Sequence, residues 1–324
     1  MIEKKTNSPN KKQTKVAIIL PCYNEEEILN YSSGKLLGLL DSLKQDQIIT
    51  GSSYLLFIDD GSKDETWNII NSLSEKHNNI KGVKLSRNFG HQNAVLAGLE
   101  VAYLETDCLI SIDVDLQDDI NVIKDMILKY QEGNKIVYGV RNERATDTFI
   151  KKNTALMFYK LIKGLGVEIV YNHADFRLAS NDVIKNLFKF DEVNLFLRGM
   201  FPLIGFKSTN VYYSRLERTA GESKYPFKKM LAFAWEGITS FSIKPLRLVT
   251  RLGMLVFFIS ILLAFYSLYS YFFKDTVPGW TSITLPIYFI SGIQLLSMGV
   301  LGEYIGKIYK ETKKRPRFII EELI

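Results

Sequence analysis

Short apolar runs alternate with longer amphipathic segments through the first half of the chain. Runs of this length are typical of buried strands, whereas the longer segments repeat apolar residues at the spacing of one helix face. The expected strands are Val16–Leu20, Tyr54–Ile58, Gly82–Leu85, Cys108–Ile112 and Ile136–Tyr138. The expected helices are Glu25–Leu43, Asp64–His77, His91–Glu105 and Asp118–Gln131. Regular alternation of this kind predicts an α/β fold in which a mostly parallel sheet lies between helices.

The alternation becomes irregular beyond Arg141. The pattern there predicts a helix at about Thr148–Lys163, a loop over Asn172–Arg177, a helix from about Asp182, and a strand over Phe206–Tyr213.

Polar residues follow four of the expected strands at the point where each strand ends. Because the carboxyl ends of parallel strands meet at one edge of a sheet, these residues predict a single ligand site. The clusters are Pro21-Cys-Tyr-Asn-Glu-Glu, Asp59-Asp-Gly-Ser, Ser86-Arg-Asn-Phe-Gly and Asp113-Val-Asp-Leu-Gln. Within this region, Ser62-Lys-Asp-Glu65 has the pattern of a capping box, which predicts that it starts the helix that follows.

The most informative cluster contains Asp113, Asp115 and Gln117. Residues two apart share a face in an extended strand, so these three side chains would present their oxygens to one small volume. Two carboxylates at that separation repel each other, so either one is protonated or a cation lies between them. Oxygen ligands suit Mg²⁺ or Mn²⁺ that carries a substrate's phosphates. The alternative is a solvated acidic turn.

Other polar residues near this edge have two interpretations each. One of Asp59 and Asp60 could accept a hydrogen bond from a ribose or a base while the other caps the turn, and Asp60 is favoured for the ligand. Tyr23 could stack on a base or simply pack against the protein. Asp175 could orient an attacking group or form a salt bridge with Arg177.

Cationic residues gather between the expected sheet and the end of the chain. They include Arg198, Arg215, Arg218 and Lys224, and the segment from Arg218 to Lys224 is a polar loop that contains glycine. Guanidinium groups match phosphate oxygens in a bidentate manner, so these residues are candidates for binding phosphate, with surface or salt-bridge roles as the alternative.

Two uncharged stretches, Leu252–Phe273 and Thr276–Gly302, are each longer than the ~20 residues that cross a bilayer. They predict a hairpin of two transmembrane helices, with a buried core hairpin as the alternative. Basic residues flank both sides of this hairpin: Lys244, Arg247 and Arg251 before it, and Lys307, Lys310, Lys313, Lys314, Arg315 and Arg317 after it. The positive-inside rule therefore predicts a multi-pass protein of the cell membrane, inner or plasma, with both ends in the cytoplasm.

Charge and composition complete the expected organisation. The net charge of +6 is concentrated near the membrane segments, which predicts contact with anionic lipids and no nucleic-acid partner. Residues 1–14 form a basic arm, expected to be disordered and without the apolar core of a signal peptide, and residues 15–224 form the cytoplasmic α/β domain. Residues 225–246 mix lysines with aromatics, as interfacial amphipathic helices do. Residues 247–308 are the two membrane helices and residues 309–324 a basic cytoplasmic tail. Small residues in the second helix, Gly299, Gly302 and Gly306, would permit a homo-oligomer.

The motifs above occur in a recognisable order with three more: Asp175-Phe-Arg-Leu, Phe196-Leu-Arg-Gly and Glu217-Arg-Thr-Ala-Gly-Glu-Ser-Lys-Tyr225. Together with the hairpin, the chain from about Lys15 to Arg317 resembles the family-2 inverting glycosyltransferases of the polyprenyl-phosphate (bactoprenol) glucosyltransferase and dolichyl-phosphate mannosyltransferase group. The resemblance implies a GT-A-type fold that binds a nucleotide sugar.

The resemblance also implies the reaction: transfer of glucose from UDP-glucose to undecaprenyl phosphate with inversion, with UDP-N-acetylglucosamine or GDP-mannose as alternative donors. The lipid-linked sugar would then serve cell-envelope glycosylation, through a separate flippase and a downstream glycosyltransferase.

Several residues acquire roles through the resemblance. Pro21, Tyr23, Glu25 and Asp60 would hold the nucleoside, and Asp113 would bind it near the metal. Asp115 and Gln117 would ligate Mg²⁺ or Mn²⁺. The donor and lipid phosphates would be bound by Arg198, Arg215, Arg218 and Lys224. The residues expected to be catalytic are Asp115, Asp175 and Arg198. Gly90-His-Gln departs from the Gly-Lys sequence of many relatives, and no donor contact is assigned to His91.

The implied chemistry needs no strong general base, because a phosphate monoester has a second pKa of about 6 and already carries negative charge at pH 7. The protein must position the reactants and neutralise the departing diphosphate, so Asp175 is expected to orient rather than accept a proton. A processive polysaccharide synthase is a more distant alternative, because the chain lacks the sequence Gln-x-x-Arg-Trp. A membrane scaffold without catalysis is the alternative that is not an enzyme.

Overall fold

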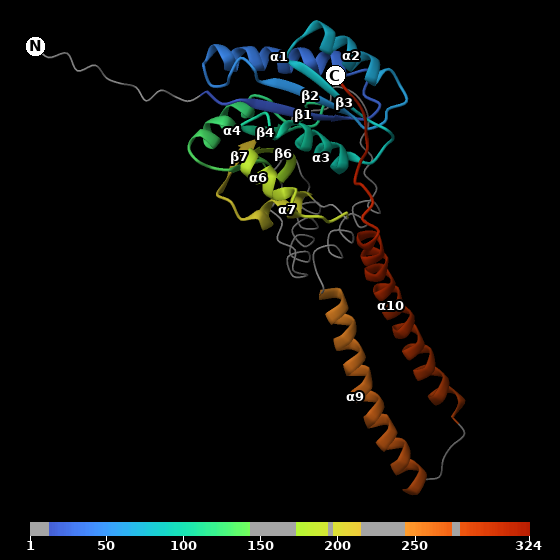
Figure 1. Ribbon diagram of the computed structural model, residues 1–324. Helices are drawn as coiled ribbons and strands as arrows, with labels where there is room; N and C mark the ends of the chain where they lie inside the picture. Colours follow the sequence, from blue (N-terminus) through green and yellow to red (C-terminus); the bar gives the residue numbers. More distant parts are fainter. Residues whose placement is uncertain (1–12, 143–172, 194–196, 215–243, 274–278) are drawn as a thin grey trace, which may run out of the picture. The chain divides into compact units, whose positions relative to one another are not determined.

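The computed structural model describes residues 13–142, 173–193, 197–214, 244–273 and 279–324 (Figure 1). The expected helix at Thr148–Lys163, nearly all of the interfacial segment, and Arg215, Arg218 and Lys224 lie outside these described residues. The chain divides into two units: an α/β unit that ends with residues 316–324, and a unit that contains two long helices.

The α/β unit is built on an eight-stranded sheet with the order β7-β5-β6-β4-β1-β2-β3-β8. Its centre is parallel: β4, β1, β2 and β3 all run in one direction, and β5 pairs with β7 in the same sense. Strand β6 is antiparallel to β4 and β5, and β8 is antiparallel to β3. The mostly parallel sheet is therefore confirmed. The strands are β1 Val16–Cys22, β2 Tyr54–Asp59, β3 Ile80–Leu85, β4 Cys108–Ser111, β5 Ile136–Arg141, β6 His173–Ser180, β7 Ser208–Tyr213 and β8 Ile320–Leu323.

Helices cover both faces of the sheet, as the alternating pattern predicts (Figure 1). On one face, α1 (Leu29–Gln45), α2 (Thr66–Lys76) and α4 (Val122–Gln131) share a core with alternate residues of β1 such as Ile18 and Leu20. On the other face, α3 (His91–Ala102) packs against the residues between them, including Ile19. Helices α6 (Asn181–Leu187) and α7 (Leu197–Ile204) lie near α3, joined to it by the Tyr103–Phe188 ring contact and by Gln92.

Three sequence-based predictions about elements outside the Asp113–Gln117 segment are wrong, and each has a physical reason. The expected loop over Asn172–Arg177 is largely strand: β6 begins at His173, and its charged residues Asp175 and Arg177 compensate each other inside the sheet. The capping box does not form, because Ser62 Oγ accepts the N–H of Asn24 instead and α2 begins only at Thr66.

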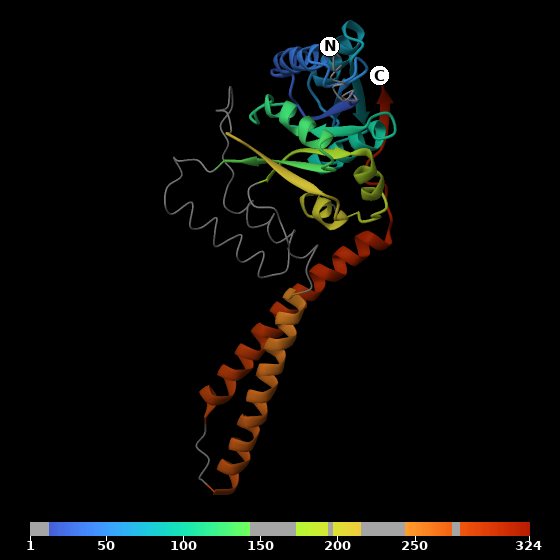
Figure 2. The same ribbon diagram turned by 90° about the vertical axis from the view of Figure 1, so that its left-hand side faces the viewer.

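The third error concerns the end of the chain, which was expected to be a basic tail. Helix α10 continues to Thr312, and the last residues form β8 at the edge of the sheet (Figure 2). Strand β8 has only four residues and two of them are glutamates, so it lacks the apolar run that marks a buried strand.

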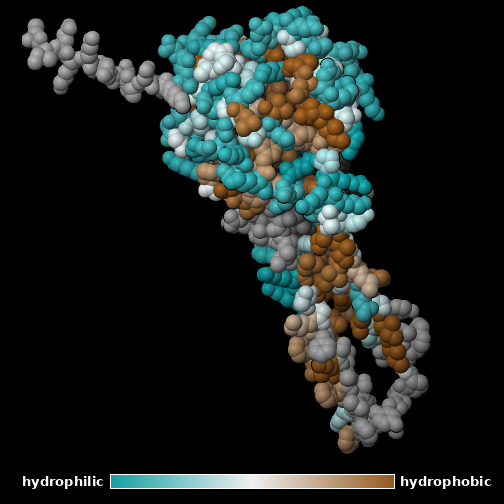
Figure 3. Space-filling view, viewed as in Figure 1, coloured by the Kyte–Doolittle hydropathy of each residue, from teal (hydrophilic) through white to brown (hydrophobic). Residues whose placement is uncertain are grey.

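The second unit contains α9 (Lys244–Phe273) and α10 (Trp280–Thr312), which contact each other. Many of their large apolar side chains face outward, so both helices are mostly hydrophobic on the surface (Figure 3). Examples are Phe258, Leu262, Phe265, Leu295, Leu296 and Met298, each more than half exposed. Exposed apolar surface on this scale is typical of contact with a membrane or another protein. Among the residues that the structure describes, one segment, Phe289–Thr312 of α10, is long and apolar enough to cross a bilayer.

A close approach between α3 and the sheet depends on Gly98. A Cβ atom at this position would lie 2.4 Å from Cγ2 of Ile19 and 3.0 Å from Cδ1 of Ile58. Both isoleucines are buried in the centre of the sheet, so neither has room to move. Gly98 therefore sets the distance between α3 and β1, and with it the position of the residues at the start of α3.

We predict opposite effects for the same substitution at two helical glycines. Gly98→Ala should lower the free energy of unfolding by about 1–3 kcal/mol, because the added methyl group overpacks the core. Gly38→Ala, on the exposed side of α1 with no atom within 4 Å of its new Cβ, should raise it by about 0.5–1 kcal/mol. Urea titrations followed by circular dichroism measure both values. Equal effects at the two positions would contradict the packing argument.

Candidate active site

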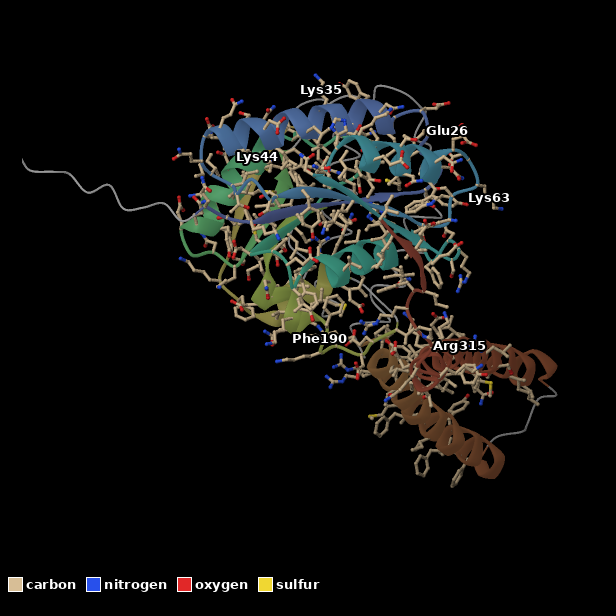
Figure 4. The ribbon with its side chains drawn as sticks, turned by 45° about the horizontal axis from the view of Figure 1, so that its top comes forward. Glu26, Lys35, Lys44, Lys63, Phe190 and Arg315 are labelled. Carbon is tan, nitrogen blue, oxygen red and sulfur yellow. The ribbon has the colours of Figure 1, made fainter. Side chains whose placement is uncertain are left out.

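The loops that follow β1 and β2 are joined at the carboxyl edge of the sheet, as their strand pairing requires. The N–H of Asn24 donates to Ser62 Oγ (2.9 Å), and its side-chain oxygen accepts the N–H of Lys63 (2.9 Å). The N–H of Glu25 donates to Thr66 Oγ1 (2.9 Å). Figure 4 shows Glu26 and Lys63 on these neighbouring loops, far from Lys44 at the other end of α1. The structure therefore brings together two of the four polar clusters in one rigid group.

Asp60 connects this group to the loop that follows β3. It is 3% exposed, and its two carboxylate oxygens accept the backbone N–H groups of Phe89 (2.7 Å) and Gly90 (2.9 Å). Burial raises the pKa of Asp60, while these two donors act in the opposite direction. Asp60 therefore holds the β3–α3 loop in place, and its expected contact with a nucleoside stays a prediction.

Asp59 and Tyr23 occupy contrasting environments at the same edge. Asp59 is fully buried, and its Oδ1 accepts the N–H of Ser62 (3.2 Å), which is the turn-capping role expected for one of the two aspartates. Burial raises its pKa. The side chain of Tyr23 is instead 41% exposed, just beyond the buried Pro21. An exposed ring at this point leaves its face open to a planar ligand.

The segment from Asp113 to Gln117 is a turn and not an extended strand. Strand β4 ends at Ser111, the N–H of Leu116 donates to the carbonyl of Asp113 (3.2 Å), and Leu116 has a φ of 48°. The strand geometry expected for Asp113, Asp115 and Gln117 is therefore wrong.

The turn forms because its apolar residues are buried while its carboxylates stay accessible. Val114 and Leu116 are 3% and 8% exposed, and Ser32 of α1 donates to the carbonyl of Val114 (2.6 Å). Asp113 and Asp115 remain partly exposed, whereas Gln117 is only 5% exposed. The N–H of Gln117 donates to Asp115 Oδ1 (3.2 Å), which holds one of its two carboxylate oxygens.

Asp175 is held by two arginines. Arg198 of α7 binds it in a bidentate manner, with Nε 3.1 Å from Oδ1 and Nη2 2.9 Å from Oδ2. Arg177 adds a third contact, Nη2 to Oδ1 at 2.5 Å, while its guanidinium lies over the ring of Phe201. Burial alone would raise the pKa of Asp175, but the charges of Arg198 and Arg177 outweigh it and hold that pKa well below its ordinary value. The Asp175–Arg177 salt bridge, one of the two interpretations of Asp175, is thus present, and Arg198 joins it.

His91 lies between two of the candidate carboxylates, although the sequence offered no role for it. Its Nε2 is 3.6 Å from Oδ1 of Asp113 and 3.8 Å from Oδ2 of Asp175, and its side chain is 44% exposed. The next residue, Gln92, accepts the N–H of Leu197 through Oε1 (2.8 Å) and so fixes the start of α7. The available signal was position: both residues begin the helix that follows the polar loop Ser86–Gly90 at the carboxyl end of β3.

A divalent cation would find a partial ligand set in the turn. In the described part of the chain, no group of three or more His, Cys, Asp and Glu residues is suited to a metal ion. Mg²⁺, however, commonly takes one or two carboxylates and completes its shell with water and substrate phosphates. Asp113 and Asp115 fit this pattern. Burial raises the pKa of Asp113, His91 opposes that rise, and the charge of Asp175 adds to it, so a cation here would relieve real repulsion.

Comparison with known proteins agrees with this architecture. Residues 17–188 match Glycosyl transferase family 2, and residues 244–308 match the GtrB C-terminal hairpin. The chain belongs to glycosyltransferase family 2. The GT-A-like α/β fold and the resemblance drawn from the motifs are confirmed.

Several relatives of this glycosyltransferase match it over nearly their whole length. It is 49% identical to "Uncharacterized glycosyltransferase YkoT" of Bacillus subtilis (strain 168), over 95% of this chain and 92% of that protein. It is 40% identical to "Prophage bactoprenol glucosyl transferase homolog" of Escherichia coli (strain K12), over 95% of this chain and 99% of that protein. It is 41% identical to "Bactoprenol glucosyl transferase" of Shigella phage SfX, with the same coverage. The similarity therefore includes both the α/β unit and the hairpin.

We predict that Asp175→Asn destabilises the glycosyltransferase by about 1.5–3 kcal/mol, because both arginines lose their counter-charge and Arg177 is nearly buried. Asp46→Asn removes a surface pair with Lys124, whose side chains are 48% and 44% exposed, and should change stability by less than about 0.5 kcal/mol. Urea titrations of the two variants provide the measurement.

The pH dependence of this difference follows from the lowered pKa. The stabilisation by Asp175 is complete above the pKa of the unfolded chain, about 3.9, and is lost as the pH falls below it. The gap between the wild type and Asp175→Asn should therefore be constant from pH 7 to about 5 and shrink below about 4. A gap that grows with acidification would contradict the ion-pair assignment.

Proposed function

We propose that the protein transfers glucose from UDP-glucose to undecaprenyl phosphate with inversion, at the cytoplasmic face of the membrane. The observation that carries this proposal is the match, at about 40% identity over almost the whole chain, to bactoprenol glucosyl transferases. The protein is a polyprenyl-phosphate glucosyltransferase on this evidence, and UDP-glucose is the donor that we infer.

The donor would bind at the carboxyl edge of β1, β2 and β4. Pro21, Tyr23 and Glu25 would contact the nucleoside together with Asp60, and the exposed ring of Tyr23 is suited to stacking on a base. A base that stacks on an aromatic ring gains apolar contact without a specific hydrogen bond, so discrimination between nucleotides would depend on neighbouring polar groups.

The diphosphate would be bound through a divalent cation. Asp113 and Asp115 would hold Mg²⁺ or Mn²⁺, with Gln117 as a further candidate ligand, and the metal would neutralise the charge that develops on the leaving diphosphate. This chain's contribution is to present two carboxylates on a turn that Ser32 and the buried Val114 hold in place.

The acceptor phosphate would be positioned without a general base. Asp175 is ionised and bound by two arginines, and a carboxylate with a pKa so far below its ordinary value is a weak proton acceptor at pH 7. Asp175 would instead orient Arg198, whose side chain is 35% exposed, so that its guanidinium could contact a substrate oxygen. Arg215, Arg218 and Lys224 are proposed to bind the lipid phosphate. Attack in line with the departing diphosphate would invert the anomeric centre.

The protein associates with the membrane through its hairpin. We propose that both α9 and α10 span the bilayer, because basic residues lie at the outer ends of the pair and a single lysine, Lys274, lies between them. This topology places the α/β unit in the cytoplasm, where nucleotide sugars are found. The glucosylated lipid would then need a flippase and a second transferase to reach the cell envelope.

The donor is tested by direct transfer. Purified protein is incubated with undecaprenyl phosphate, Mg²⁺ and radiolabelled UDP-glucose, UDP-N-acetylglucosamine or GDP-mannose, and the label in the extracted lipid is counted. We expect labelled lipid from UDP-glucose. Preferential labelling from either other nucleotide would replace the donor assignment, and no labelling from any of them would refute transfer to the lipid.

The metal site is tested by substitution and by chelation. Asp115→Asn should lower kcat at least about a hundredfold while the protein stays folded, and EDTA should have a comparable effect that added Mg²⁺ or Mn²⁺ reverses. Asp119→Asn, four residues further along the same loop region, should keep activity within about twofold. Full activity in EDTA would exclude the divalent cation.

A further inference from the structure

The C-terminal segment 316–324 contacts the α/β unit at both of its ends. At its start, the guanidinium of Arg317 donates to the carbonyl of Phe190. At its end, β8 pairs with β3, and the last residue, Ile324, exchanges two backbone hydrogen bonds of 3.0 Å with Gly82. We call this segment the C-terminal strap. Without it, β3 would be the edge strand of the sheet.

The strap also contacts the loop that leads from β3 into α3. The pairing between β3 and β8 shifts register at Leu85, and beyond the shift the N–H of Ser86 donates to the carbonyl of Ile319 (3.0 Å). Ser86 is the first residue of the β3–α3 loop, Ser86–Gly90. The strap therefore holds the first residue of this loop, whereas Asp60 holds its last two residues, Phe89 and Gly90.

The middle of the same loop rests on Gly61. A Cβ atom at Gly61 would lie 2.4 Å from the carbonyl carbon of Arg87 and 2.6 Å from the nitrogen of Asn88, so the two backbones are in direct contact. Gly61 also has a φ of 66°, a conformation that suits glycine. The loop is thus fixed at its beginning by the strap, and at its middle and end by the adjacent residues Gly61 and Asp60.

The loop determines where the first residues of α3 lie. His91, directly after Gly90, has its Nε2 within 4 Å of Asp113 and Asp175, and Gln92 holds the start of α7, which carries Arg198. A shift of the loop would therefore move groups beside both the candidate metal ligands and the Asp175–Arg198 pair. Errors of about 1 Å in such positions can cost two orders of magnitude in rate.

We propose that the C-terminal strap is a positioning element of the donor site: it holds the β3–α3 loop, and through it His91 and Gln92, in the arrangement that binds the nucleotide sugar. This inference rests on the proposed function for its kinetic consequence. Its structural consequence, an ordered loop, does not depend on that function. The strap, residues 316–324, is joined to the end of α10 at Thr312 by a linker of only a few residues.

The test uses the full chain and a variant that ends at Phe318, which removes the carbonyl of Ile319 and all of β8. Hydrogen–deuterium exchange is measured for peptides that cover Ser86–Gly90 and, as an internal reference, Val16–Leu20 of β1. We expect exchange in the loop to accelerate about tenfold or more, while exchange in β1 changes less than twofold. In the transfer assay, the KM for the nucleotide sugar should rise about tenfold.

A second pair of variants keeps the chain length constant. Lys84 and Glu321 form the ion pair between β3 and the strap, with Nζ 3.2 Å from Oε1. Glu321→Lys should accelerate loop exchange and raise the donor KM, and the double variant Lys84→Glu/Glu321→Lys should restore both values. The matched control is Glu105→Lys. Glu105 pairs with Lys81 of β3 (Nζ to Oε2, 2.9 Å) and does not contact the strap, so this variant should leave exchange in the loop and the donor KM unchanged.

Two results would overturn the proposal. Loop exchange and donor KM within twofold of the wild type in the truncated chain would show that the strap does not hold the loop. Uniformly faster exchange in β1 and the loop would make the strap a general stabiliser of the sheet. If no sugar is transferred to lipid by any variant, the proposed function fails, but the exchange measurement still decides whether the strap orders the loop.

Discussion

Negative charge concentrated at one edge of a parallel sheet is the constraint around which this protein is organised. The four central strands run in the same direction, so the carboxylates that follow them converge. Converging carboxylates repel one another, and each must be compensated or protonated. The structure uses three kinds of compensation: backbone N–H groups for Asp59 and Asp60, the Arg141 guanidinium for Asp118, and a pair of arginines for Asp175. Among the described residues, no lysine or arginine pairs with Asp113 or Asp115, and the imidazole of His91 lies 3.6 Å from Asp113. A divalent cation would supply positive charge at both carboxylates.

The partners of each carboxylate indicate its role. A carboxylate that accepts two N–H groups, as Asp60 does, acts as a clamp on the backbone. One that binds two guanidinium groups, as Asp175 does, is fixed in its ionised form and can orient a cation but is poorly suited to accept a proton. An acceptor that already carries charge makes such a site sufficient, since positioning and charge neutralisation are then the main demands. The proposed transfer to a charged phosphate needs no general base, and the pairing of Asp175 with two arginines makes it a poor one. The two observations are therefore consistent.

The sequence predicted the central sheet and its carboxyl edge because both depend on local patterns. Apolar runs and helical spacing located β1 to β5 and α1 to α4 with errors of a few residues at the ends. Strand β6 was missed because Asp175 and Arg177 read as loop residues, and only a partner distant in sequence, Arg198, completes the ion cluster that permits them in a sheet. Strand β8 was missed because its stability comes from pairing with β3 and not from its own apolar residues.

The sequence predicted which residues form the candidate site better than it predicted how they are arranged. The aspartates after each strand were identified by position, but the turn at Asp113–Gln117 depends on a hydrogen bond from Ser32, a residue far away in the chain. Likewise, Ser62, which follows β2, accepts the N–H of Asn24 from the loop that follows β1 and does not cap α2. His91 carried no motif, and its significance arises only when α3 brings it beside carboxylates from two other elements. Long-range contacts of this kind leave no periodic signal.

The position of β8 after α10 in the chain has a consequence for biosynthesis. A ribosome synthesises a chain from its N-terminus, so β3 must remain an open edge while α9 and α10 are made. The sheet can receive its eighth strand, and the β3–α3 loop its contact with Ile319, only after α10 has been synthesised. Completion of the sheet is thereby ordered in time after synthesis of the hairpin.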